Sequence, residues 1–259
     1  MSAPRSLLLL PLLAALAALS PAAAAAPGED SACGAPAEFL DGGLALPATA
    51  RAVEAGRLRI LVGGSASVFG PGTSGPGAAW PARLEALLAT WRPGLAVEMV
   101  VRGGRGLTAA ESGALIEAEL APAPAQLVLW QTGTVEAARG LEPEALTEAL
   151  TSGLERLEGA RADVVLIDPQ FSRFLRANAN VEPYLDAIRL VAAAHGVPVL
   201  RRYELMRFWA ETDRVDLERA PRGTRTAVAD RLNLCLAEAL AALIRQGVKE
   251  ARGRPTARP

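Results

Sequence analysis

The sequence contains few of the residues that most catalytic and metal-binding chemistry requires. Among 259 residues there are one histidine, one lysine (Lys249) and two cysteines. No Cys/His/Asp cluster has the spacing of metal ligands, and the glycine-rich stretch 63–77 lacks the Gly-Lys-Ser/Thr ending of a phosphate-binding loop. The formal net charge of −1 provides no positive surplus for binding nucleic acid or an anionic membrane. We therefore expect no metal site, no cofactor and no nucleic-acid partner.

Long hydrophobic runs are absent apart from one near the N-terminus. Arg5 precedes an apolar run over 7–19, and alanines with Ala-x-Ala spacing follow before Pro27. This pattern is typical of a secretory signal peptide, which we place at 1–26 with cleavage near Ala25 or Ala26. The alternative is an uncleaved anchor, although the run is short for a bilayer that a helix of about 20 residues crosses. We expect an exported protein, periplasmic or secreted, with no stable membrane span after cleavage.

The two cysteines, Cys33 and Cys235, are far apart in the sequence. An even number of cysteines in an exported chain favours a disulfide, which would join the segment after the signal peptide to the last predicted helix. The alternative is two unpaired thiols, with Cys235 a core residue at helical spacing from neighbouring leucines.

Apolar strand-like runs alternate with amphipathic helical patterns along the rest of the chain. The expected strands cover 58–62, 96–101, 126–131, 163–168 and 197–201, and the expected helices cover 80–91, 108–120, 143–157, 183–194 and 226–244. Thr108 and Glu111 have the spacing of a capping box at the start of one helix. Five strands alternating with helices predict one α/β domain over 58–246 with a doubly wound parallel sheet. An irregular lead-in at 27–57, with room for one short helix, precedes it, and a flexible basic tail at 247–259 follows it.

One edge of this sheet is the expected site. Ligands of open parallel sheets bind at the carboxyl ends of the strands, where small-residue turns follow. The run 58–70, LRILVGGSASVFG, ends a buried strand in glycines and then offers the hydroxyls of Ser65 and Ser67. The loops at 103–106, 133–136, 168–170 and 202–204 follow the other strands and should lie at the same edge.

At these positions the sequence resembles the SGNH (GDSL-type) hydrolases. The Gly-Asp-Ser block of that family corresponds to Gly63-Gly64-Ser65, its second block to 102–108 (RGGRGLT), and its Gly-x-Asn-Asp block to 133–136 (GTVE). The stretches 167–171 and 201–209 are similar to an exported bacterial branch of the family. The resemblance covers roughly 33–244 and implies a flavodoxin-like, three-layer α/β/α fold with a five-stranded parallel sheet.

The resemblance also implies an ester-hydrolysing site in which several parts are missing. Ser65 corresponds to the nucleophile, and the backbone N–H groups of Ser65 and Gly103 correspond to oxyanion donors. Val135 stands where the family has an asparagine donor, and the segment 224–227 (TRTA) stands where the family has Asp-x-x-His. The residues expected to line the cleft are Gly133, Thr134, Val135, Glu136, Asp168 and Gln170.

His195 does not replace the missing histidine. It directly precedes the fifth strand, so it belongs at the amino edge of the sheet, and a five-residue strand of roughly 16 Å separates that edge from Ser65. A carboxylate at Glu136, Asp168 or Glu204 is the remaining candidate for a base, although no spacing requires it. Two hypotheses follow. One is weak or lost hydrolysis of a small-molecule or polysaccharide ester through Ser65; the other is a non-catalytic periplasmic protein that binds a ligand or a partner in the same cleft.

Overall fold

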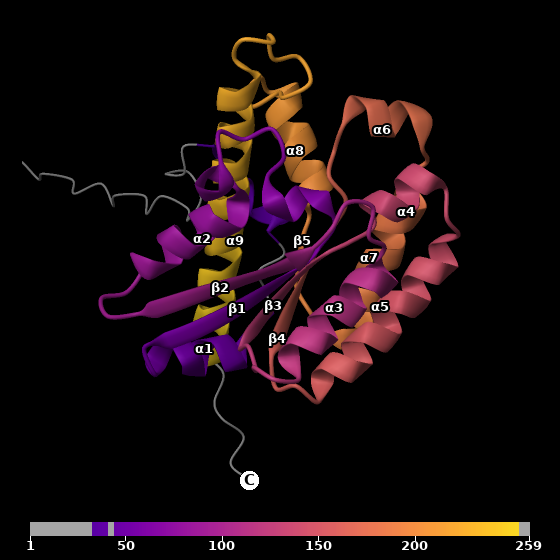
Figure 1. The fold of residues 1–259 in the computed structure, drawn as a ribbon. Helices are drawn as coiled ribbons and strands as arrows, with labels where there is room; N and C mark the ends of the chain where they lie inside the picture. Colours follow the sequence, from indigo (N-terminus) through magenta and orange to yellow (C-terminus); the bar gives the residue numbers. More distant parts are fainter. Residues whose placement is uncertain (1–32, 41–43, 254–259) are drawn as a thin grey trace, which may run out of the picture.

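The computed structural model describes residues 33–40 and 44–253, and the expected signal peptide lies outside these ranges. A five-stranded sheet forms the middle layer, in the order β2-β1-β3-β4-β5 (Figure 1). Every pairing in it is parallel. The strands are β1 (Arg57–Gly64), β2 (Ala96–Gly103), β3 (Leu127–Gln131), β4 (Asp163–Ile167) and β5 (Val199–Leu200). The predicted parallel α/β architecture is confirmed.

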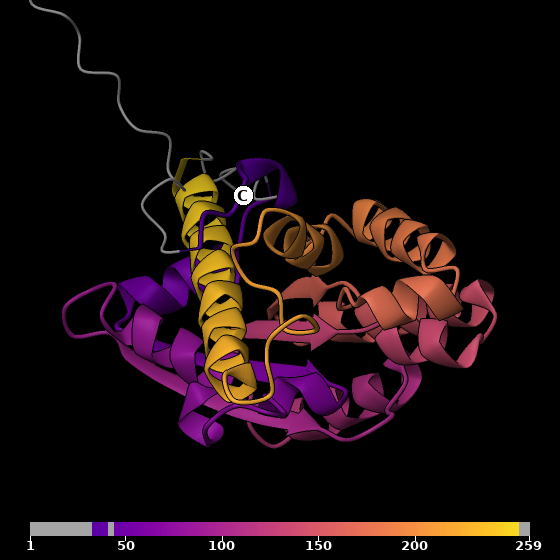
Figure 2. The same ribbon diagram turned by 90° about the horizontal axis from the view of Figure 1, so that it is seen from above.

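Helices cover both faces of the sheet because successive strand residues point to opposite faces. Leu58, Ile60 and Val62 of β1 belong to a core cluster with α1 (Pro47–Glu54), α2 (Trp80–Ala89), α8 (Arg202–Glu211) and α9 (Arg225–Gly253). Leu61 belongs to a second cluster with α3 (Ala109–Leu120), α5 (Pro143–Glu158) and α7 (Glu182–His195). Figure 2 shows the sheet between these two groups. Among the described helices, none is long and apolar enough to cross a membrane.

Most predicted elements lie within a few residues of the observed ones, and the capping box of Thr108 and Glu111 is formed at the start of α3. The strand expected at 197–201 is shorter, because Arg201 already leaves the extended conformation to begin α8. Three helices were not predicted: α4 (Thr134–Arg139), α6 (Arg173–Asn178) and α8. The first two are a turn and a half long, too short for a helical hydrophobic period.

The last helix, expected over 226–244, is longer in the structure, because α9 continues to Gly253. Its last turns pack against the lead-in: the N–H of Leu46 donates to the carbonyl of Gly247 at 2.9 Å, and Val248 is buried. The lead-in itself contains α1, whose first N–H groups, on Ala48 and Thr49, donate to the carboxylate of Asp163 at the start of β4. Residues 44–57 and 247–253, which flank the expected domain, therefore pack against it.

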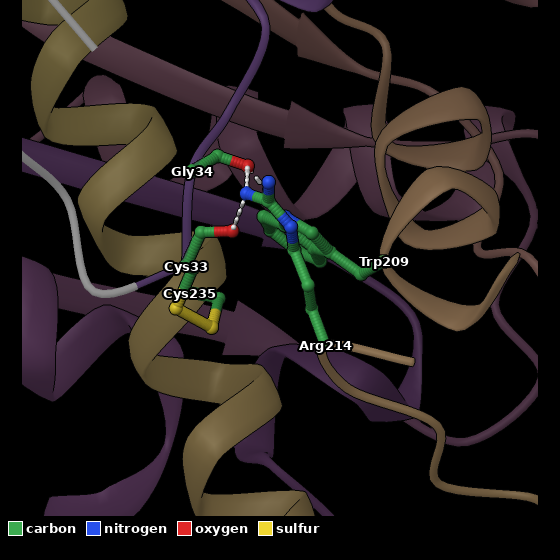
Figure 3. The surroundings of a disulfide bond; sticks show 5 residues. All are labelled: Cys33, Gly34, Trp209, Arg214 and Cys235. Carbon is green, nitrogen blue, oxygen red and sulfur yellow. Dashed lines mark hydrogen bonds between the residues drawn. A yellow bond between two sulfur atoms is a disulfide. The ribbon is translucent and has the colours of Figure 1, made fainter. Parts of the chain in front are cut away.

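A disulfide between Cys33 and Cys235 ties the lead-in to α9 (Figure 3). Arg214 donates to the carbonyl oxygens of Cys33 and Gly34 through Nη1, at 3.0 and 3.3 Å. The indole N–H of Trp209 on α8 also donates to the carbonyl of Gly34, at 3.0 Å. The lead-in thus forms a strap, residues 33–40, that links α9 to α8 across one face of the protein.

Candidate active site

The carboxyl ends of four neighbouring strands meet at one edge of the sheet. Gly64 at the end of β1 pairs with Gly103 at the end of β2, and Gln131 at the end of β3 pairs with Ile167 of β4. Ser65 follows β1 directly and starts the short helical turn Ala66–Phe69. The structure therefore places Gly103 at the end of its strand, and Ser65, Gly133 and Asp168 just after the ends of neighbouring strands, at the edge where the sequence predicts them.

Four side chains at this edge form a hydrogen-bonded chain that ends on Ser65. Arg202 donates through Nη1 to the hydroxyl oxygen of Ser67 at 3.2 Å, and Ser67 donates to Oε1 of Gln131 at 2.7 Å. Nε2 of Gln131 then donates to Oγ of Ser65 at 3.1 Å. A guanidinium has only donors, so Oγ of Ser67 accepts from Arg202 while its own proton faces Oε1 of Gln131, and in this arrangement the amide N–H₂ of Gln131 faces Ser65. Ser65 is therefore the acceptor at the end of the chain.

Arg202 anchors this chain from a buried position, with 2% of its surface exposed. Its Nε donates to the carbonyl of Asp168 at 3.0 Å, and its Nη2 donates to Oγ1 of Thr134 at 3.2 Å. The same Thr134 oxygen accepts the N–H of Gln170 at 3.0 Å. One guanidinium on α8 thus links Ser67 to the residue after β4 and to the first residue of α4.

Asp168 is fully buried beside Arg202. Its Oδ1 accepts the N–H of Tyr203 at 2.8 Å, and its Oδ2 has no hydrogen-bond partner among the described residues. Burial raises the pKa of Asp168 to about 7, against the lowering effect of the Tyr203 N–H and the Arg202 charge. Burial also lowers the pKa of Arg202 to about 10, while the charge of Asp168 acts in the opposite direction.

Gln131 also explains the glycine at position 64, where the family motif has aspartate. A Cβ on Gly64 would lie 2.8 Å from Cβ of Gln131 and 3.0 Å from Cγ1 of Val68. A Cβ on Gly103 would lie 2.4 Å from the carbonyl oxygen of Gly64. Real Cβ atoms do not approach other heavy atoms so closely, so both glycines are required by packing. Glycine at position 64, in place of the aspartate of Gly-Asp-Ser, therefore leaves the space that the side chain of Gln131 occupies.

Glu136 has a structural role in this arrangement. It is 3% exposed, and its Oε1 accepts the N–H of Ala109, the first residue of α3, at 2.5 Å. A carboxylate at this position stabilises the unpaired N–H groups and the positive end of the α3 dipole. Val135 precedes it on α4 and offers no side-chain donor.

His195 lies at the opposite edge of the sheet. It ends α7, and its Nδ1 is 3.4 Å from Oε1 of Glu158. Both residues line a cavity of about 270 Å³ together with Asp163, the first residue of β4. The segment 224–227 crosses into the first turn of α9 and contains neither an acid nor a histidine. Across the part of the chain that the structure describes, no cluster of three or more His, Cys, Asp or Glu residues could hold a metal ion.

A small apolar pocket is lined in part by Gln170, whose N–H donates to the same Thr134 that Arg202 contacts. Its volume is about 130 Å³, and Arg173 at its rim is paired with Asp216 and lies near Glu218. The apolar part of its wall consists of Phe171, Met206, Ala210, Val215, Leu217 and Leu232. An engineered cavity of roughly this size, about 150 Å³, holds benzene, so the pocket accommodates a group of similar size.

The roles of Gln131 and Arg202 were not predicted from the sequence. Gln131 ends a strand, LVLWQ, whose five residues are all buried, and a polar residue in such a strand needs a hydrogen-bond partner. That signal was available in the sequence, but the identity of the partners was not. Arg202 carried no comparable signal, because an arginine after a strand is normally exposed.

The comparisons with known proteins agree with this architecture. A profile of the Non-GDSL lipase-like family matches residues 32–250. A protein assigned to the lipolytic G-D-S-L family from Desulfitobacterium hafniense DCB-2 is 16% identical, with a TM-score of 0.56 over 72% of this chain and 99% of that one. The lipase/acylhydrolase from Enterococcus faecalis is 19% identical, with a TM-score of 0.56 over 78% and 99% of the two chains.

A catalytic mutant of an acetylxylan esterase from Geobacillus stearothermophilus is 15% identical, with a TM-score of 0.56 over 72% of this chain and 94% of that one. A search of functionally curated proteins gives no match. Identities this low establish a shared fold alone. The family profile, in contrast, covers most of the sequence, and the chain therefore belongs to the Non-GDSL lipase-like family, of the SGNH/GDSL type.

Proposed function

We propose that this protein binds an acyl ester at the carboxyl edge of its sheet, through Ser65, and that its rate of ester hydrolysis is very low or zero. The observation that carries the proposal is the partner of Ser65. The hydroxyl oxygen faces the amide N–H₂ of Gln131 at 3.1 Å, so a donor occupies the position that a general base needs.

The chemistry of ester hydrolysis supports a low rate. A serine needs a base to take its proton as it attacks the carbonyl, and the single histidine, His195, is at the far edge of the sheet. Glu136 is engaged with the N-terminus of α3. Enzymes that lose a member of a serine triad retain roughly 10³–10⁴-fold acceleration over water. Val135 cannot supply the third oxyanion donor, and losing one such donor typically costs about 10²–10³ in rate.

The apolar pocket beside Gln170 suits the acyl part of the ligand. Arg173 and Asp216 in its lining are paired with each other, so an uncharged group can enter without leaving either charge unpaired. An ester of a small molecule or of a polysaccharide fits this site, and the structural similarity to an acetylxylan esterase favours an acylated saccharide. The disulfide and the expected signal peptide together favour a periplasmic or secreted location for this binding.

The competing function is true hydrolysis, which the similarity to esterases supports. The test is turnover of 4-nitrophenyl acetate and butanoate by the wild type, Ser65→Ala and Glu136→Gln. We expect a slow release of nitrophenol that is the same in the wild type and in Ser65→Ala. Multiple turnovers that Ser65→Ala abolishes would refute the proposal. Loss of those turnovers in Glu136→Gln with an unchanged fold would identify Glu136 as the base.

Ligand binding needs its own measurement. Chemical-shift changes on titration with butanoyl and acetyl esters of xylose oligomers should occur at Gln170 and Thr134, with the butanoyl ester binding more tightly. Ala210→Phe should fill the pocket and remove that preference, while Leu190→Ala, at an exposed position on α7, should leave binding unchanged.

A further inference from the structure

The direction of the hydrogen bonds at the sheet edge determines where the proton of Ser65 points. Arg202 has no acceptor atom, and in the structure each group along the chain donates to the next: Arg202 to Ser67, Ser67 to Gln131, and Gln131 to Ser65. A serine hydroxyl has one proton and two acceptor sites. Because Oγ of Ser65 already accepts from Gln131, its proton must point to another group.

The side chain of Gln131 is held in place, so it can fix the direction of this proton. Gln131 is 2% exposed, and its Cβ lies in van der Waals range of position 64, which limits its side chain to few conformations. Ser67 holds Oε1 at 2.7 Å, and a flip of the amide would break this hydrogen bond and bring Nε2 beside a hydroxyl oxygen that already accepts from Arg202. Ser65 itself is only partly buried, so its proton has access to the cleft.

We propose that Gln131 is a positioning residue that directs the hydroxyl proton of Ser65 toward the ligand, so that the site selects a ligand offering an acceptor oxygen, such as an ester carbonyl. The inference rests on the proposed function and specifies how Ser65 recognises the ester. The same contact explains why Ser65 is a weak nucleophile. Its proton is aimed at the substrate, and the neighbour that touches its oxygen is unable to accept that proton.

The variant Gln131→Glu tests this directly, because it changes a donor into an acceptor at nearly constant shape. The carboxylate would accept from Ser67 at one oxygen and from Ser65 at the other. The probe is an alkyl fluorophosphonate, which forms an Oγ–P bond to serine while the P–F bond breaks and fluoride leaves. In the wild type the serine proton goes to water or hydroxide, whereas in Gln131→Glu it goes to the new carboxylate.

The rate of Ser65 labelling is measured by mass spectrometry of the intact protein. In the wild type we expect this rate to rise in proportion to the hydroxide concentration between pH 6 and 9, without a plateau. Gln131→Glu should label at least about tenfold faster at pH 7, with a plateau above the pKa of the new carboxylate, since a positioned base contributes about 10²–10⁴. Gln131→Met, which has similar length and no hydrogen bond, is the matched control and should keep the slope of the wild type. Ser67→Ala frees the amide to turn its oxygen toward Ser65 and should raise the labelling rate without producing a plateau.

Equal labelling rates for folded Gln131→Glu and Gln131→Met at every pH would overturn the role of Gln131. Should Gln131→Glu fail to fold, as judged by near-UV circular dichroism, an unchanged rate in Ser67→Ala would overturn it. A wild-type rate that reaches a plateau near neutral pH and disappears in Ser65→Ala would have a different meaning. It would reveal another base and refute the proposed function rather than the contact between Gln131 and Ser65.

Discussion

Restoring the aspartate of the family motif at position 64 should destabilise this protein. Gly64 is buried at the end of β1, and its φ angle is not in the left-handed region, so the backbone itself tolerates a side chain. The obstacle is space: the added Cβ would lie 2.8 Å from Cβ of Gln131, 3.0 Å from Cγ1 of Val68 and 3.1 Å from the backbone oxygen of Gln131. None of these is the far end of a flexible side chain, so strand β1 or β3 must shift.

The magnitude follows from two physical terms. Overpacking a well-filled core costs about 1–3 kcal/mol, which is the expected loss in the free energy of unfolding for Gly64→Ala. Gly64→Asp adds a carboxylate in a buried place where Gln131 already has its partners, and an unpaired buried polar group costs roughly a further 1–3 kcal/mol. We therefore expect Gly64→Asp to lower the free energy of unfolding by about 2–6 kcal/mol, in spite of restoring Gly-Asp-Ser.

Urea unfolding monitored by tryptophan fluorescence measures both losses, with thermal unfolding as a second reading. A loss of 2 kcal/mol should lower the Tm by about 4–8 °C in a chain of this size. Gly77→Ala is the matched control, because a Cβ at Gly77 meets nothing within 4 Å. A Gly64→Ala protein that unfolds within 0.5 kcal/mol of the wild type, or a Gly64→Asp protein that is more stable, would refute the packing argument at this site.

Three further predictions concern burial, covalent closure and capping. The pKa of Asp168 is about 7 in the folded protein and about 3.9 in an unfolded chain. Between these two pH values the folded state binds one proton more than the unfolded state, so the free energy of unfolding falls as pH rises through this range. Relative to Asp168→Asn, the wild type should lose on the order of 4 kcal/mol between pH 4 and pH 8, and a difference independent of pH in urea unfolding would contradict this. Replacing both Cys33 and Cys235 by serine removes a cross-link between residues 202 positions apart and should lower the free energy of unfolding by roughly 3–5 kcal/mol in the same assay. An unchanged urea midpoint would show that the strap packs equally well without the disulfide. Thr108→Ala removes the N-cap of α3 and should cost about 0.5–2 kcal/mol, with Thr108→Ser restoring most of it.

The sequence by itself determined the sheet and the edge on which its loops gather. Near-continuous apolar runs such as 58–62 and 163–168 are characteristic of parallel strands covered on both faces, and the helical patterns between them place the connections. Because the strands are parallel, the position of a residue before or after its strand decides its edge. His195 and Ser65 could therefore be assigned to opposite edges without coordinates, and the structure places them so.

Only the tertiary structure decided what Ser65 touches. The partners along the chain from Arg202 to Ser65 are between 64 and 135 residues apart, and no local pattern specifies contacts over such distances. Glu136 is an example: its place after a strand allowed the role of a base, but the neighbouring N-terminus of α3 engages its carboxylate. Residues 247–253 are another example, since the glycine at 247 suggested the end of a helix, whereas Gly247 packs closely against Leu46 and α9 continues to Gly253. Periodicity fixes which face of an element is buried, whereas the identity of a polar partner depends on how separate elements meet.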